Sequence, residues 1–83
     1  METRVGKVTH YFSHLHVAVL ELSGELSIGD TILITGHTTD LTQPVTSMEI
    51  EHQPVQKVRP GMDVALMVIE PVRRGDLVFK ITD

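Results

Sequence analysis

Hydrophobic and polar residues alternate over short stretches of this chain, and no segment keeps the 3.6-residue spacing of a helix. The clearest alternation is at residues 47–51, where Met48 and Ile50 take one side and Ser47, Glu49 and Glu51 the other. Period two with polar outer positions is typical of a strand with one solvated face. Patterns of this kind and β-branched content predict six strands, at residues 4–12, 15–22, 31–34, 41–52, 63–69 and 77–81.

Residues 15–22 differ from the others because their apolar positions are almost continuous. Such a run predicts apolar surroundings on both faces of the strand for part of its length. A buried helix is the rival interpretation. The valines and the short length, ended by a glycine soon afterwards, favour a strand.

Two Gly-Asp pairs each precede a β-branched or apolar strand, Gly29-Asp30 before residues 31–34 and Gly75-Asp76 before residues 77–81. Gly29 can supply the positive φ that a tight turn needs, and the Asp30 carboxylate can accept from nearby backbone N–H groups. The sequence therefore predicts one turn device used twice.

The stretch between residues 52 and 63 contains two prolines. Pro54 has no N–H to donate, so it is predicted to interrupt the ladder or to lie on a sheet edge, with Val55 and Val58 as core anchors. Residues 59–62 fit a type II turn, with Pro60 second and Gly61 third.

These elements predict an all-β fold that forms a single domain over residues 1–83. About six short strands with turn signals between them are typical of a barrel or a sandwich, and we favour a small β-barrel. Closure removes exposed strand edges. The 83 residues are 41% hydrophobic and include no cysteine, so apolar packing rather than disulfides must supply stability.

Charge and hydropathy limit the expected location and partners. The net charge of −4 disfavours indiscriminate binding to polyanions. No signal-peptide pattern is visible, and the longest apolar run, residues 64–69, is too short to span a membrane. We expect a soluble cytoplasmic protein with no membrane partner, either a monomer or a weak homodimer through an incompletely covered edge.

The side chains predict neither an enzyme nor a cofactor. There is no phosphate-binding loop, so no nucleoside triphosphate is expected, and no supported catalytic nucleophile. His10, His14 and His16 form the most metal-like cluster, but a zinc site needs three or four converging ligands and no carboxylate is clearly placed to help. Exposed hairpin histidines are the favoured interpretation, and metal binding is the alternative.

Four basic residues flank two turns that a barrel could bring together: Lys57, Arg59, Arg73 and Arg74. Such a cluster can contact phosphates. The alternative is a solvated rim whose charge is balanced by Glu49, Glu51 and Glu70. Aromatic residues that could stack on bases are few.

Several segments, in order, resemble the second domain of translational GTPases such as elongation factor Tu. They are residues 5–8, 18–22, 26–32, 45–49, 52, 55, 60–65 and 72–78. The stretch 70–76 is equally similar to the C-terminal barrel of the collagenase-like family that is tied to tRNA hydroxylation. The chain has no GTPase phosphate loop or switches, so GTP-driven delivery does not carry over.

The resemblance implies a small closed six-stranded β-barrel of Greek-key type and a non-catalytic role in translation. The leading hypothesis is a translation-factor-like barrel that binds tRNA, ribosomal RNA or a ribosome-associated partner, with Lys57, Arg59, Arg73 and Arg74 as phosphate contacts. The alternative hypothesis is a protein–protein docking module for a separately encoded enzyme.

Overall fold

The computed structural model describes residues 1–82, and within them the fold is all-β. The longer strands are β1 (Glu2–Phe12), β2 (Val17–Leu22), β4 (Thr31–Thr35), β5 (Asp40–Pro44), β9 (Asp63–Met67) and β10 (Leu77–Ile81). The short ones are β3 (Leu26–Ser27), β6 (Met48–Ile50), β7 (Gln53–Pro54) and β8 (Lys57–Val58). No helix in residues 1–82 is long and apolar enough to cross a membrane.

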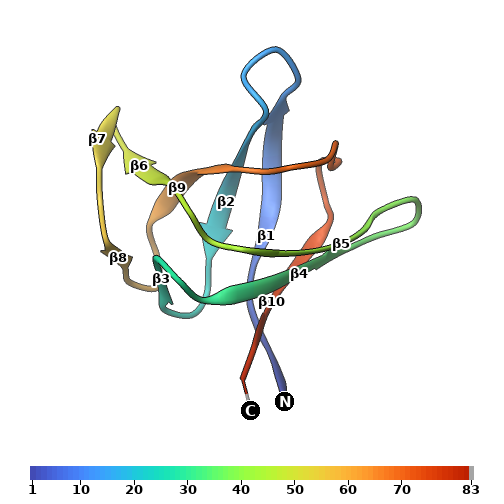
Figure 1. Cartoon of the computed structure of the whole chain (residues 1–83), viewed down its shortest axis with the longest axis horizontal. Coiled ribbons are helices and arrows are strands. Elements are labelled where there is room, and N and C mark those ends of the chain that lie inside the picture. The colour runs from blue at the N-terminus through green and yellow to red at the C-terminus, as the bar shows by residue number, and fades with distance from the viewer. Residues whose placement is uncertain (83) are drawn as a thin grey trace.

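Eight of these strands form one bent antiparallel sheet in the order β5-β4-β10-β1-β2-β9-β6-β7, and β3 pairs with β8 in a second small sheet. Figure 1 shows β4 and β5 crossing in front of β1, β2 and β10, so the bent sheet wraps around a common interior. The sheet order ends at β5 and β7. The all-β prediction is thus confirmed, whereas closure into a six-stranded barrel is not.

The interior is aliphatic. Seventeen apolar side chains are buried in the described part of the chain, among them Leu20, Ile32 and Leu66 at 0% exposure. Val58 is buried and Val55 packs against the same cluster, so both predicted anchors are confirmed. Along β4 and β9 every second side chain is buried, as expected for a sheet with one face toward the core.

Two turns have the same geometry and precede the paired strands β4 and β10. In each, the Asp Oδ2 accepts from the backbone N–H three residues earlier at 2.8 Å, Asp30 from Ser27 and Asp76 from Arg73. The glycines before these aspartates, at positions 29 and 75, have φ of 93° and 94°, which L side chains rarely adopt. The predicted turn device is confirmed at both places.

A side chain, rather than a strand ladder, ties β5 to the end of β9. The Gln43 side chain is buried, and its Nε2 donates to the Met67 carbonyl at 2.9 Å. Its Oε1 accepts from the Ile69 N–H, also at 2.9 Å. Because a primary amide carries the same kinds of donor and acceptor as a peptide group, Gln43 makes two bonds of the kind that another strand would make.

Three predicted strands need correction. The predicted strand 41–52 is two strands, β5 and β6, because the chain leaves the ladder at residues 45–47. Val45 is buried there, its N–H donates to the Asp30 carbonyl, and its carbonyl accepts from the Gly29 N–H. Residues 15 and 16 belong to the β1–β2 turn, and β9 ends at Met67. The two-residue strands β3, β7 and β8 were not predicted, because two residues carry no periodicity.

Other local predictions are confirmed. Pro54 lies in β7, at the end of the strand order, which is the edge position expected for a residue without an N–H. Gly61 has a φ of 89°, as the third residue of a type II turn requires.

The Gln43 bridge can be tested by substitution with an apolar residue of similar size. Gln43→Leu leaves the Met67 carbonyl and the Ile69 N–H without their partner, so the free energy of unfolding should fall by about 1–3 kcal/mol. Thr42→Val, at the exposed neighbouring position of β5, should change it by less than about 0.5 kcal/mol. Urea unfolding followed by circular dichroism measures both, and equal effects would contradict the bridge.

Truncating a side chain to alanine should lower the free energy of unfolding much more on the inner face of β9 than on its outer face. Leu66 is fully buried, so Leu66→Ala should lower the free energy of unfolding by about 2–5 kcal/mol. Met67 on the other face is 48% exposed, so Met67→Ala should lower it by less than about 1 kcal/mol. Urea unfolding of the two variants decides this, and a core-like loss for Met67→Ala would show that the outer face supports folding.

Candidate functional site

The outer face of strands β1, β2, β9 and β6 carries a groove of about 810 Å³. Strand register explains how its floor arises, since residues directly opposite in a ladder share a face. Val17 of β2 lies opposite Met67 of β9, and Val19 lies opposite Ala65. The four side chains are half-buried or exposed, because this face is directed away from the core. We call this site the outer groove.

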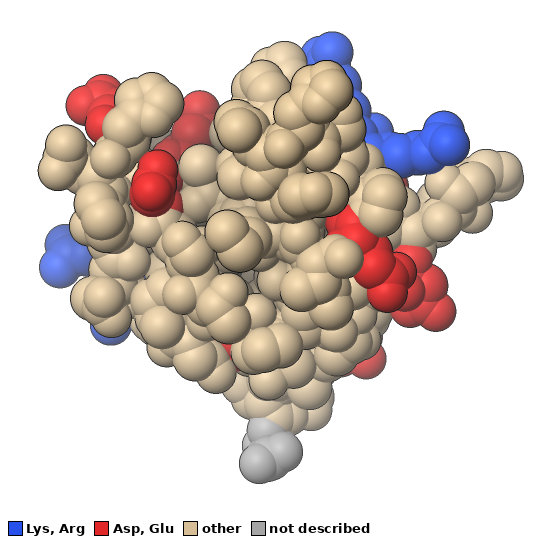
Figure 2. All heavy atoms as spheres, turned by 45° about the horizontal axis from the view of Figure 1, so that its top comes forward, with Lys and Arg blue, Asp and Glu red and all other residues tan. Residues whose placement is uncertain are grey.

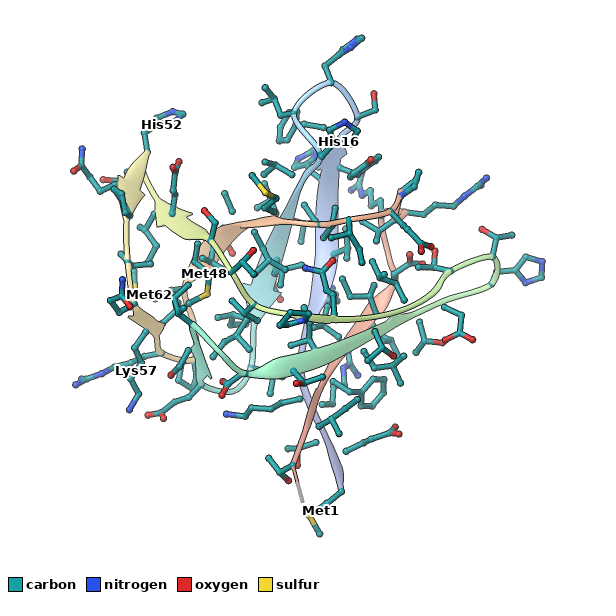
Figure 3. The ribbon with its side chains drawn as sticks, viewed as in Figure 1. Met1, His16, Met48, His52, Lys57 and Met62 are labelled. Carbon is teal, nitrogen blue, oxygen red and sulfur yellow. The ribbon has the colours of Figure 1, made fainter. Side chains whose placement is uncertain are left out.

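Two hairpins border the outer groove. The β1–β2 hairpin contributes Phe12, at the end of β1, and Leu15, in the turn, which are 48% and 65% exposed. On the other side, β6 and the β6–β7 turn contribute Ile50, Glu51 and His52. Figure 3 shows His16 in the β1–β2 connection at the top of the molecule and His52 near the end of the β6–β7 hairpin.

The non-glycine residues with positive φ in the described chain all lie on these two hairpins: His16 at 54°, Glu51 at 50° and His52 at 66°. Glu51 and His52 join β6 to β7 as a two-residue turn of type I′, in which both central residues have positive φ. Each such residue costs on the order of 1 kcal/mol.

The charged side chains that line the outer groove are Glu49, Glu51 and Asp63, and none of the described lining residues is Lys or Arg. Figure 2 shows acidic side chains at the upper left of the face, on the side of β6 and β7, and another acidic group at the right, with basic side chains at the left edge and at the upper right. The site therefore combines an apolar floor with an acidic rim.

The predicted basic cluster does not form. Lys57 lies on β8 at the far left of Figure 3. Arg73 and Arg74 lie in the turn that leads into β10, and in Figure 1 the chain makes this turn at the right of the molecule. Lys57 is paired with Glu25 at 3.4 Å, with both side chains more than half exposed, and such pairs contribute little. Contact of Lys57, Arg59, Arg73 and Arg74 with RNA phosphates stays a prediction, but they do not form one surface.

His10, His14 and His16, the predicted metal-like cluster, are spread over a strand and a turn. His10 lies on β1 and its ring is tilted against Phe12 at a centroid distance of 6.1 Å, while His14 and His16 lie in the turn after β1. Within residues 1–82, no three His, Asp or Glu side chains are grouped so that they could hold a metal ion.

Sequence reasoning missed the outer groove as a site, although one signal was present. The nearly continuous apolar run in residues 15–22 indicated two apolar faces. The inner face is core, and the outer one, with Val17 and Val19, is the groove floor. The acidic rim could not be found from the sequence, because it is assembled from β6, the β6–β7 turn and β9.

The chain is similar to segments of much longer proteins, although no protein-family model matches it. A collagenase of Porphyromonas gingivalis is 44% identical over 81 residues, which are 95% of this chain and 22% of the collagenase. An uncharacterised protease of Methanocaldococcus jannaschii is 38% identical over 80 residues, 95% of this chain and 20% of the protease. The chain thus spans about a fifth of the length of these curated relatives.

Among solved structures, the C-terminal domain of a putative U32 peptidase of Geobacillus thermoleovorans superposes with a TM-score of 0.88. The match covers 94% of this chain and 91% of that domain, at 20% sequence identity. At this identity the likeness establishes the fold and not the function.

These relatives overturn the leading hypothesis from the sequence. Resemblance to elongation factor Tu is not supported, and a translation-factor or ribosome-binding role is wrong, because the similar proteins are named collagenase and protease. The positions that carried the resemblance were mainly turn glycines and core apolar residues, which specify a fold and not a partner. The second resemblance, to the collagenase-like family, is the one supported: this chain is similar to about one fifth of such proteins and has the fold of a U32 peptidase C-terminal domain.

Proposed function

We propose that this chain is a non-catalytic protein-docking domain that acts together with a catalytic domain of the collagenase and U32 peptidase group. The observation that carries the proposal is the apolar outer face of β1, β2 and β9. Phe12, Leu15 and Met67 expose about half or more of their surface there, around the half-buried floor of the outer groove. Clustered exposed apolar side chains on a small domain mark an interaction surface.

The composition of this surface favours a protein as the partner. Aromatic and methionine side chains are enriched in protein interfaces, and the outer groove contains Phe12, Met62 and Met67. Its acidic rim would repel the phosphates of a nucleic acid. A protein partner therefore fits the apolar floor and the rim together.

The relatives indicate what kind of protein this partner is. The names collagenase and protease belong to proteins of which this chain matches about a fifth. We assign catalysis to the remaining four-fifths of such proteins and assign contact with it to this domain. Domains joined in this way commonly bury about 600–1,500 Å² between them.

A chimera tests the proposal. In the Porphyromonas gingivalis collagenase, the segment that this chain matches is replaced by the chain itself. Docking should raise the unfolding temperature of the transferred domain above that of the isolated chain, by about 4–8 °C for each kcal/mol of docking free energy. Differential scanning calorimetry of the chimera and of the isolated chain measures the difference. A transferred domain that unfolds independently, at the temperature of the isolated chain, would refute docking.

A further inference from the structure

The outer groove also indicates the chemistry of its occupant. We propose that it binds a polypeptide segment of the catalytic domain that presents apolar side chains together with Lys or Arg. This inference rests on the proposed docking function and adds to it the surface used and the charge of the partner.

The floor determines the apolar part of the recognition. Val17 and Val19 of β2 face Met67 and Ala65 of β9, so two adjacent strands present a continuous apolar strip. Phe12 lies opposite Val17 and extends the strip onto β1. A segment with apolar side chains on one side can cover this strip and remove it from water.

The rim determines the charged part. Glu49 lies opposite Ala65, directly beside the floor, and Asp63 begins the same strand two residues earlier. Asp63 also lies opposite Glu21, and like charges at directly opposed positions are unfavourable. Lys7 lies opposite Glu21 in the ladder with β1, but the β6 residues opposite β9 include no Lys or Arg. A partner cation beside Asp63 and Glu49 would offset this repulsion.

The same charges disfavour a second copy of this chain as the occupant. A symmetric dimer through the outer groove places the same patch of both copies face to face. Such a dimer would bring Glu49, Glu51 and Asp63 of both copies into one interface, and the described lining offers no Lys or Arg to balance them. Like charges across an interface oppose association, whereas a basic segment complements them.

The walls are fixed before any partner arrives. The β6–β7 wall is held by the two-residue turn at Glu51 and His52, and the Val55 N–H donates to the Met48 carbonyl at 3.0 Å beside it. The β1–β2 wall is tied down because the Val68 N–H donates to the carbonyl of residue 16 at 2.9 Å. Preformed walls reduce the ordering cost of binding.

Variants of the chimera test the site. For each variant, the rise in unfolding temperature is measured between the chimera and the isolated chain that carries the same substitution. Met67→Glu should abolish this rise, and Glu49→Lys should reduce it. Ile69→Glu is the matched control, because Ile69 is 68% exposed and does not line the outer groove. Leu15→Ser, in an exposed turn position, removes apolar surface without touching the strands and should also reduce the rise.

A second measurement is independent of the peptidase. Two synthetic peptides, one alternating leucine with lysine and one alternating leucine with glutamate, are titrated into the isolated chain and followed by amide chemical shifts. The lysine peptide should shift β2 and β9 resonances and bind about thirtyfold more weakly to Met67→Glu, the loss expected for a central interface residue. The glutamate peptide should bind wild type at least about tenfold more weakly than the lysine peptide does.

The outcomes separate the two proposals. If the chimera shows docking and Met67→Glu leaves it intact, the domain docks through another surface and this inference is wrong. If the chimera shows no docking while the lysine peptide binds selectively in the outer groove, the inference about the groove's chemistry stands and the peptidase partner is wrong. Two results would overturn the inference about the outer groove. One is equal binding of both peptides, and the other is a concentration-dependent dimer in sedimentation that Met67→Glu abolishes.

Discussion

The two hydrogen bonds that the Gln43 side-chain amide makes to the end of β9 and the residues after it are the constraint on which the shape of this domain depends. The sheet begins at β5 and passes through β9 before it ends at β7, and β5 and β9 are not paired by a ladder. Gln43 spans that gap with its side chain, bonding the Met67 carbonyl and the Ile69 N–H. Since it is 2% exposed, water cannot readily substitute for either bond. The bridge thus holds β5 against the end of β9, where the ladder with β2 places Met67 opposite Val17 in the outer groove.

Prediction from sequence succeeded where a single local interaction determines the backbone. In each Gly-Asp turn the glycine has a φ near 90°, and the aspartate that follows it accepts a hydrogen bond from a backbone N–H of the same turn. All of these interactions lie within four residues, so both turns were predictable. The strands that follow pair with each other from Thr31 opposite Ile81 to Thr35 opposite Leu77. The two turns therefore lie at opposite ends of one ribbon. That relation was not predictable, because it depends on long-range pairing.

The predictions failed where the determining contact is distant in sequence. Residues 41–52 have the alternation of one strand, yet Val45 interrupts it by turning inward and bonding to the Gly29–Asp30 turn. Lys57 lies on β8 and Arg73 lies in the connection between β9 and β10, and the distance between these two segments is set by the whole sheet. Adjacency of turns in space cannot be inferred from their order along the chain, and a site built on that adjacency is the least secure part of a sequence-based prediction.

The most informative residues for function are those that the fold does not need. A buried aliphatic side chain is required at the core positions of any such sheet, and Leu20 and Leu66 fill that role in β2 and β9. Val17, Val19 and Met67 alternate with core residues on the same strands, yet they face outward, where polar residues would serve folding equally well. An apolar side chain at such a position gains little from folding and gains from burial only when another surface covers it. The apolar run that indicated a doubly buried strand is therefore explained if the second burial occurs in a complex.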